Sequence, residues 1–291
     1  MKDIPQELLQ TYRSLTFCTK TGMRVTNREQ AIEFVNRRGF VFFWPITGLV
    51  LPSLWVAVAG DRPVADAHDD PGHVTWGWKD ALLGGRAWYY AKVVRKKATM
   101  ISFDLMPYFY ALSENYGAYE EDYLTLYEQG RLTQEAKWVY EALLYQGVLD
   151  TVELRKATHL SSPASESRFN KAITDLQADF KILPVKVTQS GAWRYAFAYD
   201  IVARHYPELP DQSHEISEKV ARQKLLDSYL CSVGAAQPDQ AAKLFQWRLA
   251  DLEDAVRALA DQGRVVENIR IEEKPGVWLA SVHFLEGHPP H

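Results

Sequence analysis

The sequence has few cysteines, no uninterrupted apolar run of membrane-spanning length and no large excess of one charge. Cys18 and Cys231 are its two cysteines, and their spacing matches no zinc, haem or iron–sulfur motif. The longest apolar stretch, residues 39–59, is broken by prolines and makes a poor membrane span. The polar start of the chain lacks the apolar core of a signal peptide. We therefore expect a cytoplasmic protein with no membrane partner.

The charge balance excludes proteins that package nucleic acid with a general basic surface. Lys and Arg total 33 against 37 Asp and Glu, a net charge of −4. This balance excludes a general basic coat for packaging nucleic acid but leaves room for a local basic surface. With 47% apolar and 24% charged residues, the chain has the composition of a globular protein.

Residues 1–128 differ from the rest of the chain because five of the nine tryptophans fall before residue 100. We predict an N-terminal helical, aromatic-rich domain over 1–128, with a degenerate winged helix as one interpretation. Its clearest helix covers residues 28–37, and weaker patterns predict helices over 51–59 and 76–83. Four tyrosines recur at helical spacing and predict one packed helix face: Tyr116, Tyr119, Tyr123 and Tyr127.

The rest of the chain repeats one order of elements twice. Three helices are followed each time by two strand-like runs around a turn. This order is typical of a winged helix-turn-helix, with the third helix as recognition helix and the hairpin as wing. We therefore predict a mainly helical α+β fold, with tandem winged helix-turn-helix units over 129–210 and 211–291. The predicted helices are 134–146, 152–158, 165–180, 220–233, 237–245 and 249–261, and the strands are 182–187, 193–197, 265–271 and 277–284.

Two basic regions indicate contact with nucleic acid. One is the start of helix 165–180 with its wing, where the third helix of a winged helix enters the major groove. The other, residues 86–97, mixes cations with aromatic side chains that suit phosphates and an unpaired base. The candidate nucleic-acid-binding residues are Arg86, Lys92, Arg95, Lys96, Lys97, Ser167, Arg168, Lys171, Lys186 and Arg194.

Other interpretations of these regions stay open. A winged helix also serves as a protein-contact module, and a basic run also occurs as a solvated helix face. The helix 249–261 carries several acidic residues that repel DNA, which leaves open whether 211–291 touches DNA. The segment 66–73, with His68 and His73, has metal-ligand types but also ordinary turn chemistry. We predict no metal and no cofactor.

Two segments of the N-terminal part carry a resemblance to a known family. The first is helix 28–37 together with the run that follows it, Gly39-Phe40-Val41-Phe42-Phe43-Trp44. The second is the run Trp76-Gly77-Trp78-Lys79-Asp80-Ala81-Leu82-Leu83. Together with the two C-terminal units, these segments resemble the YcaQ/AlkZ-type winged-helix DNA glycosylases over most of the chain. The resemblance implies tandem winged helices acting on double-stranded DNA, including damaged duplex. It also implies a role in alkylation and crosslink repair.

The chain departs from this family where catalysis would lie. The family's Gln-x-Gln or Gln-x-Asp motif falls on Phe42-Phe43-Trp44, which offers no group to handle a hydrolytic water. A second signature, His-Glu-Ala, falls near residues 78–81. Asp80 is therefore the first catalytic candidate, followed by Asp66 and Asp69. Five aromatic residues are candidates for a base-stacking pocket, or alternatively for core packing: Phe43, Trp44, Trp76, Trp78 and Trp88.

The first hypothesis is a DNA-binding protein related to DNA-repair glycosylases, with an altered catalytic motif. If it is an enzyme, it is an N-glycosidic bond hydrolase, and whether catalysis survives is left open. The alternative is a non-enzymatic winged-helix regulator or protein-interaction module. A metal hydrolase using His68 and His73 is a more distant option. The lesion recognised and the oligomeric state do not follow from the sequence.

Overall fold

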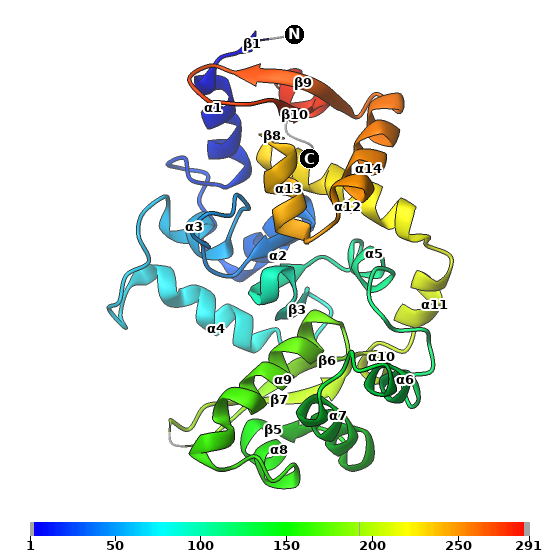
Figure 1. The fold of residues 1–291 in the computed structure, drawn as a ribbon. Helices are drawn as coiled ribbons and strands as arrows, with labels where there is room; N and C mark the ends of the chain where they lie inside the picture. Colours follow the sequence, from blue (N-terminus) through cyan, green and yellow to red (C-terminus); the bar gives the residue numbers. More distant parts are fainter. Residues whose placement is uncertain (1–2, 192, 288–291) are drawn as a thin grey trace.

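The computed structural model describes residues 3–191 and 193–287. As predicted, the fold is α+β: it is mainly helical and carries three small sheets. Figure 1 shows the sheets distributed along an elongated molecule, with the middle of the chain at one end and the two termini near the other. In the described part of the chain, no helix is both long and apolar enough to cross a bilayer.

The first sheet lies at the centre of the molecule (Figure 1). Its strands pair antiparallel in the order β2-β4-β3. Helix α2 begins where the side chain of Asn27 accepts a hydrogen bond from the Gln30 backbone, and it ends at Gly39, whose φ of 77° favours glycine. The elements are α2 (Arg28–Arg38), β2 (Phe40–Phe42), α3 (Leu54–Ala59), α4 (Val74–Ala81), β3 (Tyr89–Lys92) and β4 (Ala98–Ile101).

The second sheet and its helices form the lower end of the molecule in Figure 1. The strand order is β5-β7-β6, so the short strand between the first two helices pairs with the hairpin. Asp150 and Glu153 form a capping box at the start of α8. The elements are α7 (Gln134–Gln146), β5 (Leu149–Asp150), α8 (Thr151–Ala157), α9 (Glu166–Ala178), β6 (Ile182–Thr188) and β7 (Ala196–Ile201).

The third segment repeats this element order at the opposite end of the molecule (Figure 1). Its sheet has the order β1-β9-β10-β8, in which β1 (Asp3–Ile4) is added parallel to β9. The elements are α12 (Glu218–Val233), β8 (Ala235–Ala236), α13 (Pro238–Phe245), α14 (Leu249–Asp261), β9 (Val265–Ile271) and β10 (Trp278–Ser281), followed by the short α15 (Val282–Leu285).

The N-terminal helix belongs in space to this third segment. Helix α1 (Gln6–Thr16) packs on α12, and the hydroxyl of Tyr12 donates to the carbonyl of Cys231 at 2.7 Å. Arg13 donates to the carbonyls of Val233 and Ala235. A division of the chain at residue 128 therefore separates α1 from the segment on which it packs.

Several predicted elements differ from the structure. Helix α3 begins at Leu54 rather than at residue 51, because Pro52 precedes it and Ser53 is its N-cap. Strand β7 covers Ala196–Ile201 rather than 193–197, and the predicted strand 277–284 ends at Ser281, where α15 follows.

Two further helical predictions also differ. Tyr116 and Tyr119 precede α6 (Asp122–Glu128), because Gly117 turns the chain at a φ of 97°. Helix α9 ends at Ala178, two residues before its predicted end. Phe180 instead adopts a φ of 53° and stacks on Tyr89, with ring centroids 4.7 Å apart. Its ring thereby leaves the helix and joins the core between segments.

The largest core cluster spans all three segments. It joins Phe40 of β2, Phe180 after α9 and Leu226 of α12, together with residues of α5 (Met106–Tyr110). The short helices α10 (Val202–His205) and α11 (Leu209–His214) connect the second segment to the third. Burial of this shared apolar surface holds the segments together and fixes the cleft between them.

Candidate functional site

The structure brings the two predicted basic regions together. Lys96, in the 3-10 turn between β3 and β4, donates to Asp175 of α9 at 2.6 Å. Lys171, one turn earlier on α9, donates to the same carboxylate at 2.5 Å. Burial acts to raise the pKa of Asp175, but the hydrogen bonds and positive charges of the two lysines together outweigh it and lower that pKa. Lys92 also reaches α9, where its ammonium lies 3.4 Å from the Thr174 hydroxyl.

We call this surface the basic ridge. It joins the β3–β4 connection to the exposed face of α9, and its cations are Lys92, Arg95, Lys96, Lys97, Arg168 and Lys171. Arg168 pairs with Glu135 of α7 at 3.0 Å, so part of the charge of the ridge is neutralised. Ser167 lies on the same helix.

The remaining predicted basic residues lie apart from the ridge interactions. Arg86 pairs with Glu208 at 2.6 Å beside a different cavity, which Phe103 and Tyr108 also line. Lys186 is exposed on β6, and Arg194 is exposed at the turn before β7. These two cations therefore lie on the β6–β7 hairpin and not on the basic ridge.

Three of the five predicted stacking aromatics form a cluster. Phe43 and Trp44 follow β2, and their rings pack edge to face with centroids 4.7 Å apart. Trp76 of α4 lies 6.1 Å from Trp44 and 6.0 Å from Phe43. The indole of Trp76 is 43% exposed, so this cluster reaches the surface. Its N–H group donates to the hydroxyl of Tyr195 at 3.1 Å.

Of the other two tryptophans, one is buried in the core and one is partly buried against it. Trp88 is 1% exposed, and Trp78 packs against the same apolar cluster from α4. Burial of this kind is the usual role of a tryptophan.

Asp80 lies beside the aromatic cluster but is already paired. Its carboxylate accepts from Lys79 at 2.6 Å and from the Tyr195 hydroxyl at 2.9 Å. Lys79 is 1% exposed, and its ammonium lies 4.6 Å from the ring centroids of both Trp76 and Phe197. Burial lowers the pKa of Lys79, while the hydrogen bond to Asp80 opposes this effect. Lys79, Asp80 and Tyr195 thus connect helix α4 to the β6–β7 hairpin inside the protein.

Asp66 and Asp69 do not join Asp80. Both are exposed in the loop before α4 and make no hydrogen bond or ion pair with other described residues. In the same loop Asp70 pairs with Arg62 at 2.6 Å and also accepts from the Gly72 backbone. Over residues 3–191 and 193–287, no three His, Cys, Asp or Glu side chains are grouped as metal ligands.

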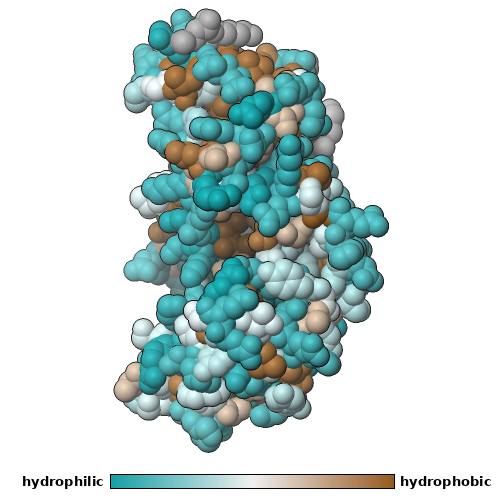
Figure 2. Space-filling view, turned by 45° about the vertical axis from the view of Figure 1, so that its right-hand side comes forward, coloured by the Kyte–Doolittle hydropathy of each residue, from teal (hydrophilic) through white to brown (hydrophobic). Residues whose placement is uncertain are grey.

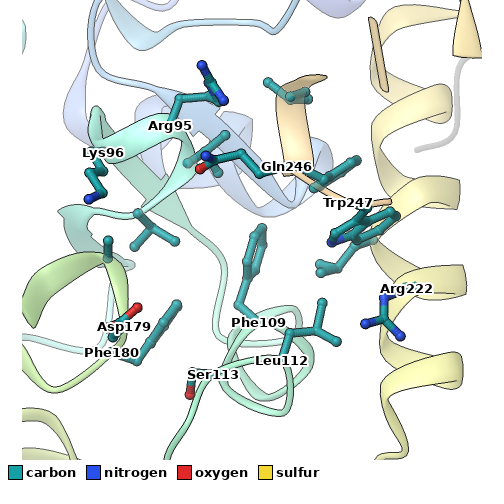
Figure 3. A pocket seen from close by; sticks show the side chains of 16 residues that line it. Arg95, Lys96, Phe109, Leu112, Ser113, Asp179, Phe180, Arg222, Gln246 and Trp247 are labelled. Atoms are coloured by element: carbon teal, nitrogen blue, oxygen red, sulfur yellow. The ribbon is translucent and has the colours of Figure 1, made fainter. Parts of the chain in front are cut away.

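A central cleft of about 340 Å³ lies where the three segments meet. Figure 3 shows Phe109 standing in its middle, Asp179 and Phe180 on one side, and Trp247 and Arg222 on the other. Figure 2 shows a hollow at mid-height, where apolar surface is exposed between two hydrophilic halves. Arg95 and Lys96 of the basic ridge also line the cleft, so the ridge and the cleft are continuous.

Sequence reasoning missed most of this cleft. Of the labelled lining residues, it singled out Arg95 and Lys96 as candidates, but not Asp179, Gln246 or Trp247. The lining comes from segments as far apart as residues 93 and 247. No local spacing connects such segments, because the long-range packing of the core brings them together.

Comparison with known proteins places the chain in a family. A family model described as AlkZ related matches residues 25–246. The fold is similar to that of the Streptomyces sahachiroi DNA glycosylase AlkZ, with a TM-score of 0.59 and 13% sequence identity over 100% of this chain and 73% of that one. No curated protein sequence matches the chain. Because the family match covers well over half of the sequence, the chain belongs to the AlkZ-related family.

Proposed function

We propose that the protein binds double-stranded DNA, including damaged duplex, through the basic ridge and the central cleft. Its family and its fold support this proposal, since the structural neighbour is named a DNA glycosylase. The order helix, short strand, helix, helix, hairpin in the second and third segments supports interpreting them as tandem winged helices. In that arrangement α9 is a recognition helix and β6–β7 its wing.

The observation that carries the proposal is the convergence of Lys96 and Lys171 on Asp175. Lys96 stands 79 positions from Asp175 in the sequence, yet it joins the exposed cations of α9 on one surface. Lysines spaced along a ridge neutralise successive phosphates, whereas isolated surface cations do not define a backbone path. The ridge also leads directly into the cleft, which offers aromatic surface.

The structure supports binding more strongly than hydrolysis. Phe42 is fully buried, and neither Phe42 nor Trp44 can take the place of the family's water-handling motif. Asp80, the first catalytic candidate, is held by Lys79 and Tyr195. A non-enzymatic DNA-binding protein is therefore the second candidate function. Release of free base from alkylated duplex would separate it from a glycosylase.

The test is binding to a fluorescently labelled duplex across a salt series. Affinity should fall linearly with log salt, with a slope of about −0.9 for each phosphate neutralised. Lys96→Glu and Arg168→Ala should each weaken binding at low salt and reduce the slope. Lys20→Glu, a charge reversal at an exposed lysine outside the ridge, is the matched control. Absence of binding at low salt, or equal effects of Lys20→Glu and Lys96→Glu, would overturn the proposal.

A further inference from the structure

A second groove lies between helices α5 and α11, apart from the central cleft. Its volume is about 580 Å³, and its floor includes the partly exposed apolar side chains of Phe103, Tyr108 and Ile216. Figure 1 shows α5 and α11 side by side, with α11 leading into α12. Phe109, in the middle of the central cleft, belongs to the same helix as Tyr108, so α5 lies between the two hollows.

The groove is acidic, in contrast to the basic ridge. Among the described residues that line it, Arg86 is the single cation, and Glu208 neutralises it at a distance of 2.6 Å. Asp104 of the lining, and Asp211 and Glu215 beside it, are exposed and make no ion pair with other described residues. A negative surface of this kind repels phosphates. The groove is therefore a poor continuation of a DNA-binding surface, although Arg86 was predicted to contact nucleic acid.

The acidic residues follow one face of α11. Glu208, Asp211 and Glu215 are three and four positions apart, a spacing that aligns side chains along a helix. Acids near the start of a helix stabilise it through the helix dipole, which accounts for Glu208 and Asp211. Glu215 lies at the other end, where a negative charge is unfavourable, and it repels Asp211. Helix stability therefore does not explain this charge pattern, whereas a cationic partner does.

Arg86 illustrates how a cation binds in this groove. Its guanidinium pairs with Glu208 and lies 5.9 Å from the ring centroid of Tyr206. A carboxylate and an aromatic face together hold an arginine or lysine more strongly than either alone. Asp104 and Tyr108 offer the same two groups to a cation from outside the chain.

We propose that this groove docks a basic segment of a partner protein, in which arginine or lysine side chains alternate with large apolar ones. The apolar side chains cover the floor of the groove, and the cations pair with Asp104, Asp211 and Glu215. Carboxylates spaced along α11 match a chain with spaced cations better than a single small cation. A groove of about 580 Å³ accommodates a short segment rather than a folded domain, so the interaction is a transient one. This inference goes beyond the proposed DNA binding and does not depend on it.

Three labelled synthetic peptides separate apolar contact from charge attraction. The first repeats Arg-Leu-Gly, the second Arg-Ser-Gly and the third Glu-Leu-Gly, and fluorescence anisotropy measures their binding. The wild-type protein should bind the first about tenfold more tightly than the second, because the leucine side chains leave water on binding. It should not bind the third, whose charges repel the groove.

Variants of the protein test the groove itself. The double variant Asp211→Asn/Glu215→Gln keeps the shapes of two exposed side chains and should weaken binding of the Arg-Leu-Gly peptide about five- to tenfold at low salt. The matched control, Glu267→Gln/Glu272→Gln, removes the same charge from exposed positions on and after β9 and should leave the affinity unchanged. Ile216→Ser should weaken binding of the Arg-Leu-Gly peptide but not of the Arg-Ser-Gly peptide, since it removes apolar surface alone.

Photocrosslinking then locates the bound peptide. A benzoylphenylalanine in place of one leucine should crosslink within residues 103–108 or 208–216, as identified by mass spectrometry. Crosslinks confined to other surfaces would overturn the inference, as would equal affinities for the Arg-Leu-Gly and Arg-Ser-Gly peptides. Equal losses in the double variant and its matched control would do the same. Absence of peptide binding would also reject the docking site, and it would leave the proposed DNA binding untouched, because no DNA is present in these measurements.

Discussion

Tyr195 donates its hydroxyl hydrogen to the carboxylate of Asp80 at 2.9 Å, although 115 positions separate the two residues. The same oxygen lies 2.9 Å from the ammonium of Lys79 and 3.1 Å from the indole nitrogen of Trp76. Helix α4 is thereby attached to the hairpin β6–β7 through a lysine that water does not reach. The stability of this connection depends on mutual pairing, because an unpaired buried charge is costly.

Lys79→Ala should therefore lower the free energy of unfolding by about 3–5 kcal/mol, since it leaves Asp80 without its cation and opens a cavity among aromatic rings. Lys79→Met keeps most of the packed side chain and should cost clearly less. Urea denaturation of the wild-type protein and both variants measures this difference. Equal stability of Lys79→Ala and the wild-type protein would show that the connection does not contribute to folding.

Removal of the negative charge of Asp175 tests whether the lysines of the basic ridge contact DNA phosphates. Asp175→Asn removes the one carboxylate that both Lys96 and Lys171 contact, while the shape of the side chain is kept. We expect affinity for duplex DNA to rise a few-fold at low salt, with the gain shrinking as salt increases. The stability cost should stay near about 0.5–1 kcal/mol because both lysines are largely exposed. Unchanged affinity over the whole salt range would contradict phosphate contact by these lysines.

His205 predicts a pH dependence of stability. Its Nε2 atom lies 2.8 Å from the carbonyl oxygen of Gly84, and its Nδ1 atom lies 3.6 Å from Asp200. The Asp200 carboxylate beside Nδ1 raises the pKa of His205 above the ordinary 6.5, although burial opposes the shift. The folded state therefore binds the proton more tightly than the unfolded state. The resulting stabilisation is complete below the unfolded pKa and is lost as pH rises through the folded pKa.

The variant His205→Gln isolates this contribution. The difference in unfolding free energy between the wild-type protein and His205→Gln should be larger at about pH 5.5 than at about pH 9. Urea denaturation at several pH values provides the comparison, and groups common to both proteins cancel in the difference. A difference that grows toward high pH would contradict the assigned pairing.

Local patterns predict elements well where capping and periodicity agree. Helices α7 and α14 and strand β9 have the bounds predicted from the sequence, and Thr133 and Gly147 mark the ends of α7. The chain order helix, helix, helix, hairpin was likewise predicted for the second and third segments. These features depend on residues a few positions apart, and the sequence contains them directly.

Features that depend on contacts between segments were not predicted. The sequence around Lys79 gives no reason to expect burial of this lysine. In the structure, aromatic side chains from α4, β3 and the β6–β7 hairpin enclose its ammonium group. Phe180 continues the apolar spacing of α9, yet packing against Tyr89 draws it out of the helix. The cleft arises from such long-range contacts, which explains why Asp80 was selected and Asp179 was not.

Asp179 provides the last prediction, which concerns the pH dependence of stability. Desolvation of its carboxylate raises the pKa of Asp179 above the ordinary 3.8, and the nearby Asp175 adds to this effect, while Lys181, Lys96 and Arg131 oppose it. The folded state therefore binds this proton more tightly than the unfolded state, so the stabilisation is complete below the unfolded pKa and is lost as pH rises through the folded pKa. The difference in unfolding free energy between the wild-type protein and Asp179→Asn, which does not titrate, should be larger at about pH 3.5 than at about pH 7. Urea denaturation at both pH values measures this difference. A difference that grows toward neutral pH would mean that the positive charges of the neighbouring lysines and Arg131, rather than desolvation, dominate at this carboxylate.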